Sequence, residues 1–380
     1  MTRVFEIADR LVRHAVRRYP DQVDLIVCYG SHIKGTATAA SDLDTYYVPA
    51  SPGAAETLCA QFVFDGLPYD LWPVPWSMLE QISRAEGDRP WSLAVSLISD
   101  ARILFARDQA ARSRFQALQQ AAADALKPPA RPRMLQRAGA ALSRALAVLG
   151  RMHMLAATEA AERVDHIRAA HEFFFHLYDA AALVNQRPYA KGYGANHAEL
   201  LRMPLLPPEF GRRIDAALAQ PGAPESLRAA SDCAAGLRTL IAAELRRTAA
   251  PESPATALRS FYFFVLEYTH KIRSACERSD RPAARGAVIA LVNETAEVLA
   301  RIEPGLPSTS GLLWREFAQG YVSARLPELL LIAEDDDLPA LARAAARFDA
   351  AMLRFLQTRG VSADVFDDER ELQAFLDARV

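Results

Sequence analysis

The stretch YGSHIKGTATAASDLDTYYV, residues 29–48, contains the pattern on which the interpretation of the whole chain depends. An apolar run ends there in a Gly-Ser pair, and after a loop of small and polar residues two aspartates follow, Asp42 and Asp44. Ionised carboxylates on a buried strand are costly unless they are paired or bind a cation. Because alternate residues of a strand share a face, we expect both carboxylates to project together while Leu43 turns into the core.

Two neighbouring carboxylates suit a hard divalent ion such as Mg²⁺, which also takes phosphate oxygens and water as ligands. Gly30 lacks a side chain, so backbone N–H groups can approach an anion there, and Ser31 adds a hydroxyl beside them. Asp70 is a lone charge in the apolar run YDLWPV, and a third carboxylate on an adjacent strand would complete a two-metal arrangement. Lys34 could reach a phosphate, although a solvated loop lysine is an equal alternative. These residues predict a site for a magnesium–nucleotide complex.

The segment GSHIKGTATAASDLD resembles the signature of the polymerase-β-type nucleotidyltransferase superfamily: Gly-Ser, a spacer, Asp-hydrophobic-Asp and a later acidic residue. Its spacer is most similar to that of minimal and antibiotic-modifying members, and the chain looks closest to kanamycin nucleotidyltransferase-like proteins. The resemblance implies that Asp42 and Asp44 hold the metals and that Asp70 is a third ligand or a base. The candidate nucleotide-binding residues are Gly30, Ser31, Lys34, Ser41 and Lys271.

A second resemblance concerns FVLEYTHKIRS, residues 264–274, where Glu267 and Lys271 stand four residues apart on one helix face. Such a pair is commonly a solvated stabiliser, but the apolar run before it predicts a largely buried helix. LEYTHKIR is similar to the kanamycin nucleotidyltransferase helix that carries the catalytic base and, four residues later, a lysine near the phosphates. The resemblance implies that Glu267 is the general base and that Lys271 neutralises phosphate charge.

Hydrophobic periodicity predicts an α+β protein. A helix at 3–18 precedes expected strands at 25–29, 43–48, 61–65, 69–74 and 101–108, with helical pieces in 76–99 and only helical patterns beyond about 109. Pro-rich breaks at 127–133 and 250–255 are candidate boundaries. We predict a polymerase-β-like nucleotidyltransferase domain with a small mixed sheet at 1–108, a helical domain at 109–250, and a helical C-terminal domain at 251–380.

Two features of the helical part are open to more than one interpretation. VLGRMHML (148–155) echoes VLEYTHKI (265–272), which suggests duplicated helical units, although Ala/Leu-rich helices match easily by chance. The earlier copy lacks the Glu–Lys pair. The loop after residue 184 offers Asn185, Tyr189, Lys191 and Tyr193 as candidates for an acceptor pocket, and Glu172 precedes it; an ordinary interhelix loop is the alternative.

Composition narrows the class of protein. The 380 residues hold 44 Lys+Arg and 46 Asp+Glu, a balance that disfavours nucleic acid or an anionic membrane as partner. Four separated cysteines without a CxxC pair argue against a zinc site or a disulfide framework. Neither a secretory signal nor a membrane-spanning run is visible, so a cytoplasmic protein is expected.

Together these patterns predict an enzyme that transfers a nucleoside monophosphate, AMP from ATP or another triphosphate, to a hydroxyl group of a small molecule and releases pyrophosphate. Two Mg²⁺ ions are the expected cofactors, and the protein is expected to be a monomer or homodimer. By resemblance the favoured acceptor is an aminoglycoside-like antibiotic. The alternatives are AMPylation of a protein or nucleic-acid acceptor of toxin–antitoxin type, cyclic-dinucleotide synthesis, and a non-catalytic nucleotide sensor.

Overall fold

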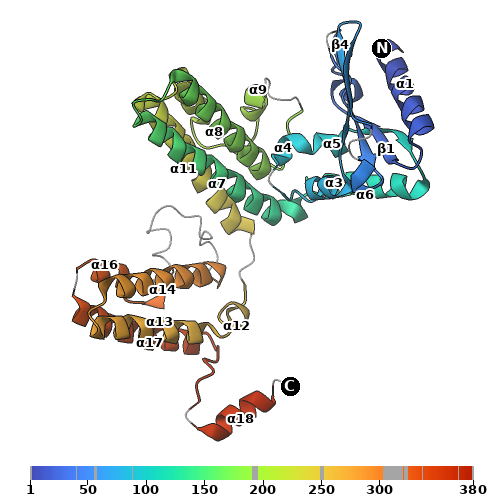
Figure 1. Cartoon of the computed structure of the whole chain (residues 1–380). Helices are drawn as coiled ribbons and strands as arrows, with labels where there is room; N and C mark the ends of the chain where they lie inside the picture. The colour runs from blue at the N-terminus through green and yellow to red at the C-terminus, as the bar shows by residue number, and fades with distance from the viewer. Residues whose placement is uncertain are drawn as a thin grey trace. The chain divides into compact units, whose positions relative to one another are not determined.

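The structure is a computed structural model that describes residues 2–39, 41–54, 58–87, 89–190, 196–248, 252–302, 320, 324–335, 337–366 and 368–378. The chain divides into two compact units, Met1–Ile241 and Ala242–Val380 (Figure 1). This division is coarser than the predicted boundaries near residues 108 and 250.

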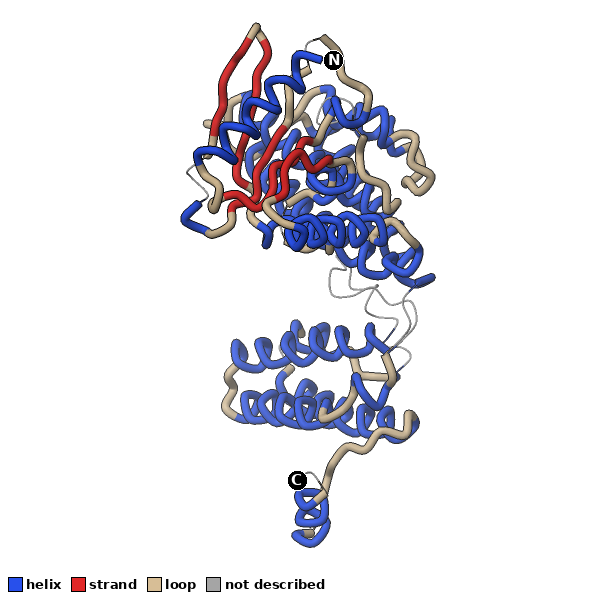
Figure 2. The backbone as a smooth tube through the Cα atoms, turned by 90° about the vertical axis from the view of Figure 1, so that its right-hand side faces the viewer, coloured by secondary structure: helices blue, strands red, loops and turns tan. Residues whose placement is uncertain are grey.

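The first unit contains a five-stranded mixed sheet with strand order β3-β4-β2-β1-β5 (Figure 2). The strands are β1 (Val23–Cys28), β2 (Thr45–Pro49), β3 (Ala60–Phe64), β4 (Leu67–Pro73) and β5 (Arg102–Ala106). β2 and β4 are parallel, whereas the other neighbouring pairs are antiparallel. Helix α1 (Thr2–Arg18) packs Ala15 against Ile26 and Tyr47. The predicted α+β class with a small mixed sheet is therefore confirmed.

Short helices follow two of the strands and surround the region of interest. They are α2 (Ser31–Lys34), the 3₁₀ turn η1 (Pro52–Ala54), α3 (Trp76–Ser83), α4 (Trp91–Ala94) and α5 (Ser96–Ser99). The two helical pieces expected in 76–99 are thus three. Pro75 and Pro90 stand immediately before α3 and α4, at helix starts where the missing backbone N–H is tolerated.

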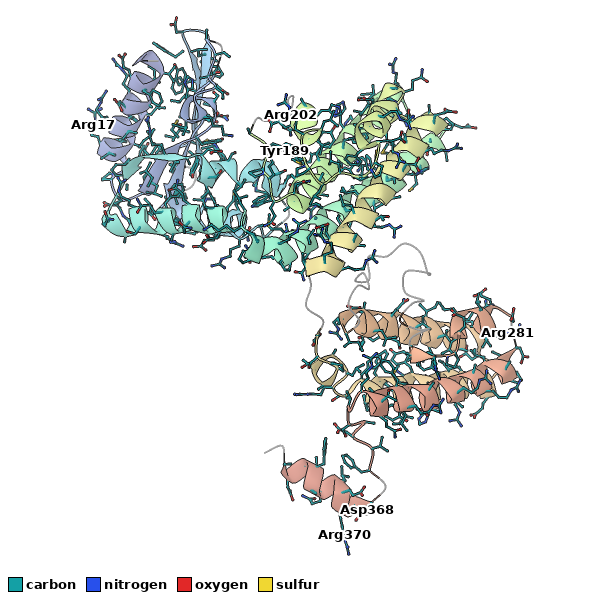
Figure 3. The ribbon with its side chains drawn as sticks, turned by 180° about the vertical axis from the view of Figure 1, so that it is seen from behind. Arg17, Tyr189, Arg202, Arg281, Asp368 and Arg370 are labelled. Carbon is teal, nitrogen blue, oxygen red and sulfur yellow. The ribbon has the colours of Figure 1, made fainter. Side chains whose placement is uncertain are left out.

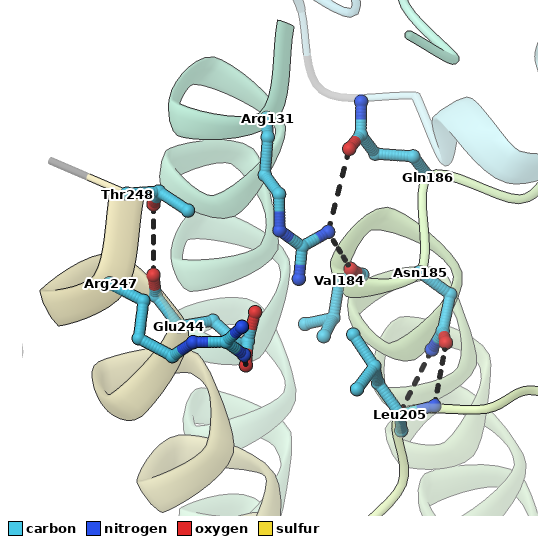
Figure 4. Close-up of polar contacts among 8 residues, drawn as sticks. All are labelled: Arg131, Val184, Asn185, Gln186, Leu205, Glu244, Arg247 and Thr248. Carbon is cyan, nitrogen blue, oxygen red and sulfur yellow. Dashed lines mark hydrogen bonds and ion pairs between the residues drawn. The ribbon is translucent and has the colours of Figure 1, made fainter. Parts of the chain in front are cut away.

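The remaining helices of the first unit are α6 (Gln109–Asp124), the 3₁₀ turn η2 (Pro128–Ala130), α7 (Arg131–Ala156), α8 (Arg163–Val184), α9 (Asn196–Leu200), α10 (Phe210–Ala219) and α11 (Pro224–Thr248), which extends past the division between the units. Of these helices, α6 packs against the sheet and against α3 and α5, whereas α7 and α8 pack on each other. Polar contacts secure the end of α8: Arg131 donates to the Val184 carbonyl at 2.8 Å, and Asn185 exchanges two hydrogen bonds with the Leu205 backbone (Figure 4).

A buried carboxylate connects these helices to the sheet-containing part. Asp179 of α8 is 2% exposed, and its Oδ1 accepts hydrogen bonds from the backbone N–H and the hydroxyl of Ser92 at 2.9 and 2.7 Å. Tyr189 adds a backbone hydrogen bond to the Ser92 carbonyl at 3.1 Å. These contacts place α8 beside α4, at the N-terminal end of that short helix.

The second unit is helical in its described residues. It contains α12 (Pro254–Ala257), α13 (Phe261–Glu277), α14 (Arg281–Ile302), α16 (Leu329–Glu334), α17 (Leu338–Thr358) and α18 (Glu369–Asp377). Its core joins α13, α14 and α17 through side chains such as Val265, Leu291 and Phe348. Asp337 caps α17 by accepting the Ala340 N–H at 2.8 Å.

The two echoing sequences occupy helices that are each followed by a packed partner helix. The first lies in α7, which packs on α8, and the second lies in α13, which packs on α14. Ordinary helical hairpins have the same arrangement, so the duplication stays a prediction. Across the described part of the chain, no helix combines the length and the apolar character needed to cross a bilayer.

Candidate active site

The first component of the site is the tight turn at Gly30, between the end of β1 and the start of α2. Gly30 has φ 79° and ψ −154°, a backbone conformation that is essentially restricted to glycine. A Cβ atom built on it would lie 2.0 Å from Oδ2 of Asp44. Glycine is therefore required twice here, once by the backbone and once because the Asp44 carboxylate occupies the space beside it.

The second component is the Asp-Leu-Asp segment, which differs slightly from the expectation. β2 begins only at Thr45, so both aspartates precede the strand rather than belonging to it. Leu43 still forms an isolated parallel bridge with Tyr69 and is 1% exposed, while Asp42 is exposed and Asp44 is half-buried. The predicted alternation therefore holds without regular strand pairing, because burial of Leu43 is enough to turn its neighbours the other way.

The third component is Asp70 on β4, the strand that pairs in parallel with β2. Its Oδ1 accepts the Thr45 N–H at 2.9 Å, and the Thr45 hydroxyl donates to the Asp70 carbonyl. The carboxylate is thereby held at the start of β2, directly after Asp44. The parallel pairing of β2 and β4 brings together residues that are 25 or more positions apart in the sequence.

The three carboxylates affect one another electrostatically. Burial, and then the charges of Asp42 and Asp70, raise the pKa of Asp44 to about 7, while Lys34 acts in the opposite direction. Burial also raises the pKa of Asp70; the hydrogen bond from Thr45 opposes that rise, and the charge of Asp42 adds to it. Negative charge is thus concentrated where it is poorly solvated, and a bound cation would relieve it.

Asp42 and Asp44 border a cavity of about 740 Å³ within the first unit, whereas Asp70 is not among its lining residues. Gly30, Ser31, Lys34, Ser41, Asp42 and Asp44 all line it. Ser31 Oγ is buried and has no hydrogen-bond partner among the described residues. A buried hydroxyl without a partner is unfavourable in the free protein, so it is suited to donate to a ligand.

Lys34 and Ser41 have contacts with the protein itself. Lys34 Nζ donates to the Ala190 carbonyl at 2.7 Å and lies 3.4 Å from the Asp100 carboxylate. Ser41 Oγ accepts the Thr38 N–H at 2.8 Å. Lys34 is therefore not a freely solvated loop lysine: it lines the cavity and connects α2 to the segment after α8, and its contact with a phosphate stays a prediction.

The donor set fits Mg²⁺ that arrives with phosphate. In the described residues no three His, Cys, Asp or Glu side chains converge into a ready metal-binding group. Mg²⁺ does not need such a cage, because it commonly takes one or two carboxylates and completes its shell with phosphate oxygens and water. Asp42 and Asp44 would be its protein ligands, and the Ser31 hydroxyl beside them suits a phosphate oxygen.

Several cavity-lining residues were not singled out from the sequence. Trp72, Arg89 and Phe175 line the cavity, and Arg89 is an exposed cation there. No local motif marks Arg89 or Phe175, since only the packing of α4 against α8 brings them to the sheet edge.

Of the candidates for an acceptor pocket, Tyr189 lines the cavity. Figure 3 labels Tyr189 in the first unit. Asn185 instead bonds to the backbone of Ala181 and Leu205, which is a structural role. Glu172 forms an ion pair with Arg151 outside the cavity. Lys191 and Tyr193 lie outside the described residues.

Glu267 and Lys271 lie together on α13 of the second unit, where their side chains form an ion pair at 2.7 Å. The two side chains are 41% and 51% exposed, so the expectation of burial on this helix was wrong for this face. The apolar residues of α13 pack toward α14 and α17, and the Glu–Lys face points to solvent. Their catalytic role stays a prediction.

Comparison with known proteins gives only distant structural likenesses. No protein-family model and no curated protein matches the chain. Among solved structures it is similar to a nucleotidyltransferase-like protein from Exiguobacterium sibiricum 255-15, with 15% identity, coverage of 64% of this chain and 78% of that chain, and a TM-score of 0.38. So distant a likeness supports no functional conclusion.

Proposed function

We propose that the chain is a metal-dependent nucleotidyltransferase that transfers a nucleoside monophosphate, AMP from ATP, to a hydroxyl group of a small molecule. The observation that carries the proposal is the position of Asp42 and Asp44 beside the Gly30–Ser31 turn at one cavity, with Asp70 near enough to raise the pKa of Asp44. A partly buried cluster of carboxylates next to an unpartnered hydroxyl requires a ligand with both positive and negative charge. A magnesium–triphosphate complex has both.

In the proposed reaction an oxygen of the acceptor hydroxyl attacks the α-phosphorus of the nucleotide. A new phosphorus–oxygen bond forms, and the bond between the α-phosphorus and the oxygen that bridges to the β-phosphorus breaks. Pyrophosphate leaves with that electron pair, and the acceptor proton passes to a base. When bound, Mg²⁺ would neutralise charge on the phosphates at Asp42 and Asp44.

The chain's own residues would bind and orient the nucleotide. The Gly30 turn allows a close approach to backbone N–H groups, and Ser31 offers its hydroxyl to a phosphate oxygen. Lys34 and Arg89 supply positive charge at the rim. Glu267 is proposed as the base, by resemblance; Asp70 is the alternative, because its raised pKa and its position next to the metal ligands suit a proton acceptor.

The decisive experiment measures pyrophosphate release from each nucleoside triphosphate, with Mg²⁺ or EDTA, against a panel of hydroxylated compounds that includes aminoglycosides. Turnover should require Mg²⁺ and should fall at least about a hundredfold in Asp44→Asn, as expected when a group that stabilises transition-state charge is lost. Asp21→Asn removes one exposed carboxylate elsewhere in the same unit and should keep full activity. Equal turnover of Asp44→Asn and Asp21→Asn would contradict the proposal, and binding of nucleotide without turnover would favour a sensor.

A further inference from the structure

A second, smaller chamber of about 190 Å³ adjoins the cavity at the carboxylates. The two spaces share Leu93, Phe175 and Tyr189 as lining residues. We call the smaller space the inner chamber; it lies between α4, α8, α9 and α10 of the first unit. Its contact with the larger cavity means that a molecule held inside could present one group to the site of phosphoryl chemistry.

Aromatic side chains make up much of the inner chamber. Phe174 and Phe175 of α8 line it together with Tyr178 and Tyr189. A dry cavity of about 150 Å³ is known to hold benzene, so a space of this size accommodates one six-membered ring. The lining also includes polar side chains, and a combination of apolar walls and placed polar groups is typical of sites that fix a small molecule by shape and orient it by hydrogen bonds.

One polar atom of the inner chamber is left without a partner. Asn196 is 5% exposed, and its Oδ1 has no hydrogen-bond partner among the described residues. Two neighbouring polar side chains have partners: the Tyr178 hydroxyl lies 2.9 Å from Nδ1 of His197, and Nε2 of His197 lies 3.5 Å from the Asp215 carboxylate. His171, which also lines the chamber, is exposed. A buried acceptor oxygen without a donor costs stability, so Asn196 is better explained by a ligand that donates to it.

The charges around the inner chamber favour a neutral ligand. No lysine or arginine belongs to its described lining, so an anion would find no counter-ion there. The lining carboxylate, Asp179, already accepts two hydrogen bonds from Ser92, and its charge is attracted by Arg144 and Arg137. The Asp179 carboxylate is therefore already hydrogen-bonded and partly charge-compensated, so it is poorly suited to bind a cationic ligand.

The nucleotide does not need this space. The larger cavity holds the carboxylates and the phosphate-binding turn, and it also has an apolar wall that includes Trp72, Met78 and Leu97, against which a base can pack. A transfer reaction has two substrates, and the inner chamber is the adjoining place for the second.

We propose that the inner chamber holds the acceptor, a compact neutral hydroxylated six-membered ring that donates a hydrogen bond to Asn196 and presents another hydroxyl to the carboxylate cavity. The proposal rests on the transfer function above and assigns acceptor recognition to α8, α9 and α10 of the first unit.

The test uses the full chain and trans-1,4-cyclohexanediol as the probe, a neutral six-membered ring with one hydroxyl at each end, observed by saturation-transfer NMR with and without Mg²⁺ and a non-hydrolysable α,β-methylene analogue of ATP. The probe should bind in both conditions. Asn196→Leu should weaken its binding at least tenfold while leaving the affinity for the nucleotide analogue unchanged. The melting temperature of Asn196→Leu should not fall, because the substitution removes a buried oxygen that has no partner.

A second variant blocks the space itself. Leu218 lines the inner chamber and is not among the residues of the larger cavity, so Leu218→Trp should abolish probe binding and preserve nucleotide binding. Val164→Trp, at a 51% exposed position outside both spaces, is the matched control and should bind the probe normally.

Three results would overturn the inference. Absence of probe binding to the unsubstituted chain would refute the ligand class. Displacement of the probe by the nucleotide analogue or by adenosine would assign the inner chamber to the base of the nucleotide. Undiminished binding in both Asn196→Leu and Leu218→Trp would place the ring elsewhere. Nucleotide binding and its loss in Asp44→Asn are measured separately, so either failure can be recognised without the other.

Discussion

Substitution of Gly30 by alanine is the sharpest test of the phosphate-binding turn. The added Cβ would lie 2.0 Å from Oδ2 of Asp44 and 3.0 Å from its Cγ, whereas ordinary contacts begin at 3.4 Å. The carboxylate would therefore have to retreat from 2.0 to 3.4 Å, a shift of about 1.4 Å. Thr45 follows Asp44 directly and is tied to Asp70, so such a shift also disturbs the neighbouring carboxylate.

Two magnitudes follow. A non-glycine residue in this backbone region costs about 1–3 kcal/mol, so the free energy of unfolding of Gly30→Ala should fall by that amount. A displacement of roughly 1 Å at a reacting centre can cost about a hundredfold in rate, so turnover should fall at least that far. The two losses differ in cause, since the first comes from the backbone and the second from the position of Asp44.

The variant Gly35→Ala separates the loss of stability caused by the backbone from the loss of activity caused by the displaced Asp44. Gly35 also has positive φ, +71°, but a Cβ built on it meets nothing within 4 Å. It should lose about 1–2 kcal/mol of stability while keeping its affinity for the magnesium–nucleotide analogue. Calorimetric titration with the analogue and thermal unfolding of both variants decide the matter. If Gly30→Ala binds the nucleotide as tightly as Gly35→Ala does, the proposed contact between this turn and the site is wrong.

Three further predictions concern charge and the base. Without metal, the raised pKa of Asp44 means that the folded state keeps the Asp44 proton at pH values where the unfolded chain has released it, so stability should fall from about pH 4 to 7 and then level off. In thermal scans with EDTA, Asp44→Asn should flatten this profile. Mg²⁺ should raise the melting temperature more at pH 8 than at pH 5. Asp179→Ala leaves two buried Ser92 donors without an acceptor, so unfolding by urea should show a loss of about 2–4 kcal/mol, and an unchanged midpoint would refute that account. If Glu267 is the base, Glu267→Gln should lower kcat by about 10²–10⁴ with nucleotide affinity unchanged, and an equal rate would leave the role to Asp70.

Much of the local architecture was predictable because it depends on neighbours in the sequence. Alternation around Leu43 follows from burying one apolar side chain between two charged ones, and the helix at the N-terminus follows from its apolar spacing. The need for glycine at position 30 was also visible as a residue type, although the reason was incomplete. Only the structure shows that the Asp44 carboxylate occupies the space where a side chain would be.

Sequence reasoning was least successful where a helix has two unlike faces. The apolar run before Glu267 suggested burial, yet the ion pair with Lys271 points to solvent. An amphipathic helix can bury one side completely and leave the other exposed, so the composition of a segment does not determine the environment of each residue in it.

By itself, the sequence determined the chemistry available to this protein: a glycine turn, a hydroxyl and carboxylates at a spacing that suits a metal and a phosphate. Only the tertiary structure determined which residues from distant parts of the chain surround the glycine turn and the carboxylates. Lys34 meets the carbonyl of Ala190, 156 residues away, and Phe175 and Tyr189 border both the carboxylate cavity and the inner chamber. Such long-range contacts form because buried polar groups such as Asp179 and Ser92 need hydrogen-bond partners. The local sequence pattern does not identify which distant residue supplies the partner.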